Sequence, residues 1–236
     1  MTNVPTPKPR TRKSRAAGDE KSRTDTVLLA ALAHVPADGF TDSTLAAAAR
    51  EAGISEAECS RLFPDGALSL VDAFSRWADA EMIGELSRVQ KPGAKIRERI
   101  TAAVLARITV LRPHKEAARR AAAFLTLPPH AARGITLLYR TVDEIWRGIG
   151  DTSTDFNFYT KRAILAGVYT STLMRWFTDT GDEETDTREF LDRRIGDVMR
   201  FEKFKAQVKE RAAQWPSLAD IFKPRQAEPK PRPRRA

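Results

Sequence analysis

Apolar residues recur every three or four positions through the middle of the chain, a spacing that places them on one face of an α-helix. Ile96, Ile100, Val104 and Ile108 form one such stripe at a spacing of four. No run of alternating apolar and polar residues is bounded by turn residues, and no Asn-Gly or Asp-Gly pair joins two apolar segments. The pattern therefore predicts an all-α protein.

Proline, glycine and capping residues divide this pattern into separate helices. Ser55, with Glu58 three residues later, has the spacing of a capping box at a helix start, and Gly53 ends the helix before it. Short helical turns are expected near 114–125. Longer helices are expected at about 24–35, 41–52, 55–62, 67–89, 96–112, 130–148, 153–178 and 184–204.

Positive charge gathers at the two ends of the chain. The 236 residues carry a net charge of +9, of which 1–23 contribute +5 and 201–236 contribute +6, so the remainder is at −2. Both ends also contain several prolines and few apolar residues. We expect a disordered basic arm over 1–22 and a disordered basic tail over 224–236. The chain between them divides into a helix-turn-helix-like module (23–80), a helical bundle (81–205) and an amphipathic segment (206–223).

The first three expected helices resemble the amino-terminal module of TetR-type regulators, in which the third helix enters the DNA major groove. The resemblance is carried by Gly39-Phe40-Thr41, Ala52-Gly53-Ile54-Ser55 and Leu62-Phe63-Pro64. Residues 24–80, however, hold three basic and nine acidic side chains, a net of −6. DNA binding gains affinity when a protein neutralises phosphates, so this charge disfavours DNA binding.

Aromatic and charged residues are concentrated in 143–177. On a helical wheel, Asp155 and Arg162 fall inside the apolar arc of the helix expected to begin near Ser153. A charge in that position requires a partner or a place at the edge of the fold, and Asp155, Tyr159 and Arg162 are spaced so that they could form one hydrogen-bonded set. In one interpretation Asp155 caps the helix and Phe158 and Tyr159 are core aromatics. In the other, the segment is a solvent-reaching patch of the kind found at protein interfaces.

The same segment resembles the coenzyme Q biosynthesis lipid-binding proteins, the COQ nine family. The matching residues are Val142-Asp143-Glu144-Ile145-Trp146, Ser153 to Asn157, Tyr159-Thr160, Arg162-Ala163 and Phe190 to Ile195. The resemblance implies a protein with a TetR-like fold that does not act on DNA. Such a protein binds an isoprenoid quinone intermediate or another lipid in a cavity and assists the di-iron demethoxyubiquinone hydroxylase. Phe158 stands where the family usually has tryptophan. By position, the hydroxylase-facing residues are Asp143, Ile145, Asp155, Phe158, Tyr159 and Arg162.

Two further groups of apolar residues are candidates for lipid and membrane contact. A cavity wall and an ordinary core require the same residue types, so both interpretations of the first group stay open. The second group follows a stripe flanked by lysines, as in helices that lie on anionic membranes. The lipid-binding candidates are Ile100, Val104, Ile108, Leu138, Val142, Leu173 and Phe177. The membrane-contact candidates are Phe201, Phe204, Val208, Trp215, Ile221 and Phe222.

Motifs for catalysis, metals and cofactors are absent from the sequence. The three histidines are isolated, no Glu-x-x-His pair or phosphate-binding glycine loop occurs, and Cys59 lies on an acidic helix that disfavours a thiolate. We therefore expect no active site. The resemblance to the COQ nine family implies a homodimeric accessory protein of ubiquinone biosynthesis at the inner membrane, bacterial or mitochondrial. A TetR-type regulator that senses a lipophilic ligand and a general membrane-docking scaffold are the alternatives.

Overall fold

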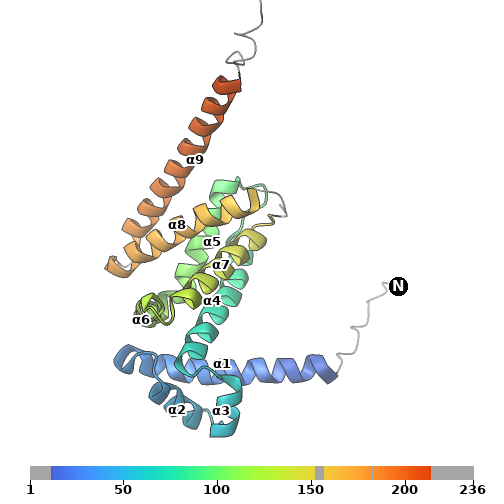
Figure 1. Ribbon diagram of the computed structural model, residues 1–236, viewed down its shortest axis with the longest axis vertical. Helices are drawn as coiled ribbons and strands as arrows, with labels where there is room; N and C mark the ends of the chain where they lie inside the picture. The colour runs from blue at the N-terminus through green and yellow to red at the C-terminus, as the bar shows by residue number, and fades with distance from the viewer. Residues whose placement is uncertain (1–11, 152–156, 182, 214–236) are drawn as a thin grey trace, which may run out of the picture. The chain divides into compact units, whose positions relative to one another are not determined.

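The chain folds into α-helices, and a computed structural model describes 12–151, 157–181 and 183–213, without the side chains of 12–17, 157 and 201–213. These described residues contain no strand, which confirms the all-α prediction (Figure 1). The elements are α1 (Arg12–Asp38), α2 (Asp42–Glu51), α3 (Glu56–Leu62), α4 (Ala67–Val89), α5 (Ile96–Leu111), the short 3₁₀ turn η1 (Arg112–His114), α6 (Lys115–Thr126), α7 (Ala131–Gly148), α8 (Asn157–Thr178) and α9 (Thr185–Ala213).

Local capping sets the starts of the second and third helices. The Thr41 hydroxyl accepts a hydrogen bond from the Thr44 amide at 3.1 Å, and the Ser55 hydroxyl accepts one from the Glu58 amide at 3.3 Å. Each bond satisfies an amide that the first turn of a helix leaves unpaired. The Glu58 carboxylate does not complete the expected capping box, because it pairs with Arg23 of α1 instead.

Two expectations are wrong for the described residues. Helix α1 begins at Arg12, so 12–22 continue a helix instead of belonging to a disordered arm. Residues 115–126 form the full helix α6, not isolated turns. Both segments are rich in alanine, lysine and arginine, which favour the helical backbone even where little apolar surface is buried.

Helix α4 connects the first three helices to the later ones within one compact unit, Met1–Ile195. It contacts α1 and α2 with its first turns and α5 and α7 further along (Figure 1). Phe40 and Phe74 join the two regions, with ring centroids 6.0 Å apart. The expected module boundary at residue 80 therefore falls inside a continuous helix. Helix α9 continues beyond Ile195 into a second unit, as far as Ala213.

The connection between α8 and α9 is held by two buried carboxylates. Glu184 accepts a hydrogen bond from the indole of fully buried Trp176 at 2.7 Å and two from the Arg112 guanidinium at 3.0 and 2.8 Å. Asp179 accepts hydrogen bonds from the hydroxyl and the amide of Thr187, at 2.6 and 2.9 Å. These bonds fix the first turn of α9 against the end of α8.

Acid is expected to weaken this connection. Hydrogen bonds from Thr187 hold the pKa of Asp179 below its ordinary value of 3.8, so their stabilisation is present above about pH 4 and is lost as the pH falls through the lowered value. We expect Asp179→Asn to lower the free energy of unfolding by about 1–3 kcal/mol at pH 7. Urea denaturation of both proteins should show the difference shrinking below about pH 4; a difference that grows on acidification contradicts the assignment.

Candidate functional site

The end of α7 and the first turns of α8 bring together Asp143, Phe158, Tyr159 and Arg162, which we call the α7–α8 cluster. Asp143 lies in the last turns of α7, and the other three side chains occupy the first two turns of α8. Of the expected hydroxylase-facing residues, Asp155 lies outside the described residues. The structure thus assembles most of the expected patch from two helices.

Arg162 forms the base of the cluster. Its side chain is 2% exposed, and its Nε and Nη2 lie 2.8 and 2.7 Å from the Asp143 Oδ1. Its Nη1 donates a hydrogen bond to the Phe158 carbonyl at 3.3 Å. A buried guanidinium is costly without an anionic partner, and Asp143 supplies one. Arg162 was expected to require a partner because it lies inside the apolar arc of α8. That partner is Asp143, which comes from α7.

The aromatic rings of Phe158 and Tyr159 pack next to this ion pair. The Arg162 guanidinium carbon is 3.3 Å from the centroid of the half-buried Phe158 ring, a cation–π contact. The Tyr159 ring meets Phe158 edge to face, with centroids 5.1 Å apart and planes at 77°. Tyr159 is 68% exposed. An exposed tyrosine is thereby presented to solvent from a packed and hydrogen-bonded base.

One expected contact residue cannot reach a partner in this conformation. Ile145 is 0% exposed and belongs to the core of α7, because it lies on the face of that helix opposite to solvent. Arg162 is also buried, so its place is beneath the surface, where it orients Phe158. The exposed part of the cluster is the Tyr159 ring with the edge of Phe158.

The lipid-binding candidates lie in the helical core or at its margin. Val104, Ile108 and Val142 are almost fully buried. The other four candidates are partly buried: Ile100, Leu138, Leu173 and Phe177. Their helices pack together, since α5 and α8 both contact α7. A lipid cavity among them stays a prediction.

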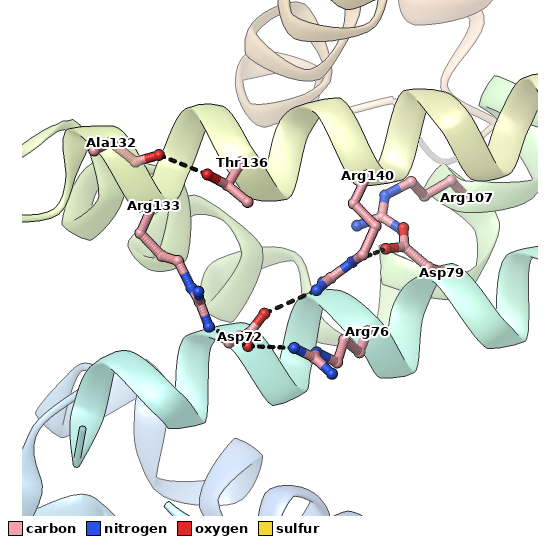
Figure 2. A network of polar contacts seen from close by, with 8 residues as sticks. All are labelled: Asp72, Arg76, Asp79, Arg107, Ala132, Arg133, Thr136 and Arg140. Carbon is pink, nitrogen blue, oxygen red and sulfur yellow. Dashed lines mark hydrogen bonds and ion pairs between the residues drawn. The ribbon is translucent and has the colours of Figure 1, made fainter. Parts of the chain in front are cut away.

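Sequence reasoning missed a network of charges in the middle of this bundle. Asp72 on α4 accepts hydrogen bonds from Arg76 at 3.0 Å, from Arg133 at 2.7 Å and from Arg140 at 2.9 Å (Figure 2). Burial alone would raise the pKa of Asp72, but the bonds from Arg76 and Arg140 outweigh it and lower the pKa. Both arginines from α7 thus bind a single carboxylate on α4.

A second carboxylate lies two helical turns further along α4. Asp79 pairs with Arg107 of α5 and lies 3.3 Å from the Arg140 Nε (Figure 2). Arg107 also donates a hydrogen bond to the Tyr169 hydroxyl of α8 at 2.7 Å, and burial raises the pKa of that hydroxyl. Asp79, Arg107 and Tyr169 are all buried. These contacts tie four helices together through charged side chains.

This network changes the interpretation of the acidic module. The spacing of seven between Asp72 and Asp79 places both on one face of α4, a signal that was present in the sequence. Setting these two buried residues aside leaves three basic and seven acidic side chains in 24–80, a net of −4. Helix α3 itself still carries Glu56 and Glu58 against Arg61. The module therefore remains acidic where a DNA-reading helix is expected to be basic.

Cys59 and the membrane-contact candidates complete the expected sites. Burial and the nearby Glu56 raise the pKa of the Cys59 thiol, as the acidic setting indicated. Phe201, Phe204 and Val208 belong to α9, in the part for which the structure describes the backbone but not the side chains. Trp215, Ile221 and Phe222 lie outside the described residues. Each helix within the described ranges is too short or too polar to traverse a bilayer.

Comparisons with known proteins agree with this architecture. A family model described as COQ9 matches residues 131–202. "Ubiquinone biosynthesis protein COQ9, mitochondrial" of Rattus norvegicus is 36% identical over 78% of this chain and 61% of its own length. The Homo sapiens protein of the same name is 34% identical over 78% and 59%. The chain thus spans about three fifths of these relatives.

A solved structure extends the likeness to the fold. The TetR transcriptional regulator from Nitrosomonas europaea superposes with a TM-score of 0.59 and 17% identity, over 74% of this chain and 97% of that one. At this identity the likeness concerns the fold alone, which is TetR-like. The chain is therefore similar in sequence to COQ9 proteins of ubiquinone biosynthesis and TetR-like in fold.

Proposed function

We propose that this protein is a non-catalytic accessory protein of ubiquinone biosynthesis, which binds a polyprenyl intermediate and assists the di-iron demethoxyubiquinone hydroxylase. The names of its relatives support the pathway. The observation that carries the partner assignment is the exposed Tyr159 ring, which rests on the ion pair between buried Arg162 and Asp143. Aromatic residues held rigidly at a surface are typical anchors of protein interfaces.

The base of the α7–α8 cluster suits it for binding a partner. A flexible tyrosine loses rotational freedom when it binds, whereas a ring already packed against Phe158 loses less. The Phe158 ring is itself fixed by the Arg162 guanidinium, which Asp143 holds in place. The cluster therefore offers the hydroxylase a preorganised aromatic surface, although position 158 is a phenylalanine and not the tryptophan usual in the family.

The lipid and membrane parts of the proposal rest on the later helices. The apolar candidates lie on α5, α7 and α8, and α7 contacts both of the other helices, so separation of these helices would open a cavity among them. The amphipathic pattern that begins with Phe201 on α9 supports contact with an anionic bilayer. A homodimer through α8 and α9 is part of the same proposal, by analogy with the family.

Quinone analysis of a deletion strain tests the proposed function. Without the protein, demethoxyubiquinone should accumulate and ubiquinone should fall, because the hydroxylase lacks its accessory protein. Mass spectrometry of lipid extracts measures both compounds. Complementation with the intact gene must restore the normal ratio. A deletion strain with normal quinones contradicts the proposal.

A TetR-type transcriptional regulator is the second candidate, and the fold favours it. The acidic side chains of α3 oppose it, since this helix carries Glu56 and Glu58 but only one basic side chain, Arg61. Altered transcripts with unchanged quinones in the deletion strain would favour the regulator. Tight binding of the purified protein to a defined DNA duplex at physiological salt would support it directly.

A further inference from the structure

The turn between α4 and α5 borders an open surface pocket of about 510 Å³. Its walls come from the end of α4, the turn itself and the first turn of α5: Ser87, Gln90, Lys91, Pro92, Gly93, Ala94 and Arg99. Two of these residues are cationic and none carries a carboxylate. A pocket of this size and charge is suited to a small anionic ligand.

Arg99 is the more buried of the two cations that line this pocket. Its Nε is buried and has no hydrogen-bond partner among the described residues. Its Nη2 lies close to Gly150 after α7, where a side-chain carbon would come within 3.1 Å of it. Gly150 thus leaves room for the guanidinium. A buried guanidinium nitrogen without an acceptor is unusual, because such groups are nearly always hydrogen-bonded.

The nearby carboxylates are engaged elsewhere. Glu98 accepts a hydrogen bond from the Lys95 amide at 3.1 Å, and Glu85 pairs with Arg88 at 3.3 Å. Arg97 pairs with Asp192 of α9. Lys91 and Arg99 form no ion pair with the residues that the structure describes. The first turn of α5 adds the positive end of a helix dipole to these two charges.

We propose that this pocket binds the phosphate group of a phosphate ester. The planar guanidinium of Arg99 offers paired donors that match phosphate oxygens, and Lys91 adds a mobile point charge at the rim. The volume exceeds that of phosphate alone and leaves space for the group esterified to it. The inference does not depend on the proposed function, because the α7–α8 cluster contributes no side chain to the pocket.

Calorimetric titration of the full-length protein tests this site. The probes are pyrophosphate, dihexanoyl phosphatidic acid below its micellar concentration, and dihexanoyl phosphatidylcholine. We expect the first or second to bind with 1:1 stoichiometry and the zwitterionic lipid to bind more weakly. Binding of pyrophosphate shows that the pocket accepts a soluble phosphate group without a lipid, and binding of phosphatidic acid alone identifies a lipid headgroup.

The double variant Lys91→Gln with Arg99→Gln should weaken binding at least about tenfold, because charge-assisted hydrogen bonds are lost. The matched control is Arg88→Gln with Arg97→Gln, which removes the same charge from the neighbouring paired cations. It should change the affinity by less than about twofold. Equal weakening in both variants, or no binding of either anion to the unmodified protein, overturns the proposal. Thermal melting checks that both variants fold.

Discussion

Replacing Asp79 with alanine should lower the free energy of unfolding by about 3–5 kcal/mol. The change leaves Arg107 buried without its anionic partner, since Arg107 and Asp79 are both 4% exposed. The Tyr169 hydroxyl that also binds Arg107 is neutral and cannot replace a carboxylate. Urea denaturation at pH 7 measures the loss.

Two further variants make this result specific. Asp192→Ala removes a carboxylate from the exposed pair with Arg97, and it should cost less than about 1 kcal/mol. Adding Arg107→Met to Asp79→Ala should recover part of the lost stability, because no buried charge then lacks a partner. If Asp79→Ala costs no more than Asp192→Ala, the network in Figure 2 does not stabilise the bundle.

Tyr159→Ala should weaken capture of the demethoxyubiquinone hydroxylase roughly 30-fold or more, the effect of losing an interface residue worth at least about 2 kcal/mol. The fold should stay intact, since the ring is 68% exposed and removing it leaves the Arg162–Asp143 pair unchanged. Pull-down of the purified hydroxylase over a range of concentrations measures the affinity.

Leu29→Ala is the matched control, because Leu29 is also a large exposed side chain but lies on α1. It should leave capture unchanged. Phe158→Lys should also abolish capture, but it places an ammonium beside the Arg162 guanidinium and is the less specific test. Unchanged capture by Tyr159→Ala, at an unchanged melting temperature, refutes the assignment of the cluster to this partner.

The helices themselves could be predicted because their limits are local. Ser55 caps α3 with a bond to an amide three residues away, and Gly53 adopts a φ of +67° that other residues avoid. The start of α1 at Arg12 could not be predicted in this way. Its first turns carry almost no apolar residues, so the sequence lacks the periodic pattern that marks a helix.

Some features of the α7–α8 cluster could be predicted from the sequence, and others depend on how the helices pack. Its residues could be named from the resemblance to a family, and the wheel showed that Arg162 requires a partner. That the partner is Asp143, nineteen positions earlier, depends on how α7 packs against α8. The same packing buries Ile145, which position alone had assigned to the surface.

The amino-acid sequence by itself determined the helical class, most helix limits, the resemblance to COQ9 proteins and the acidic character of the first module, since each depends on residue type and short-range spacing. The tertiary structure decided which charges are buried together. Asp79 of α4 pairs with Arg107 of α5 and with Arg140 of α7. Arg99 of α5 lies close to Gly150, which follows α7. Such contacts join residues far apart in the chain, and no local pattern specifies them because they exist only once the helices have packed.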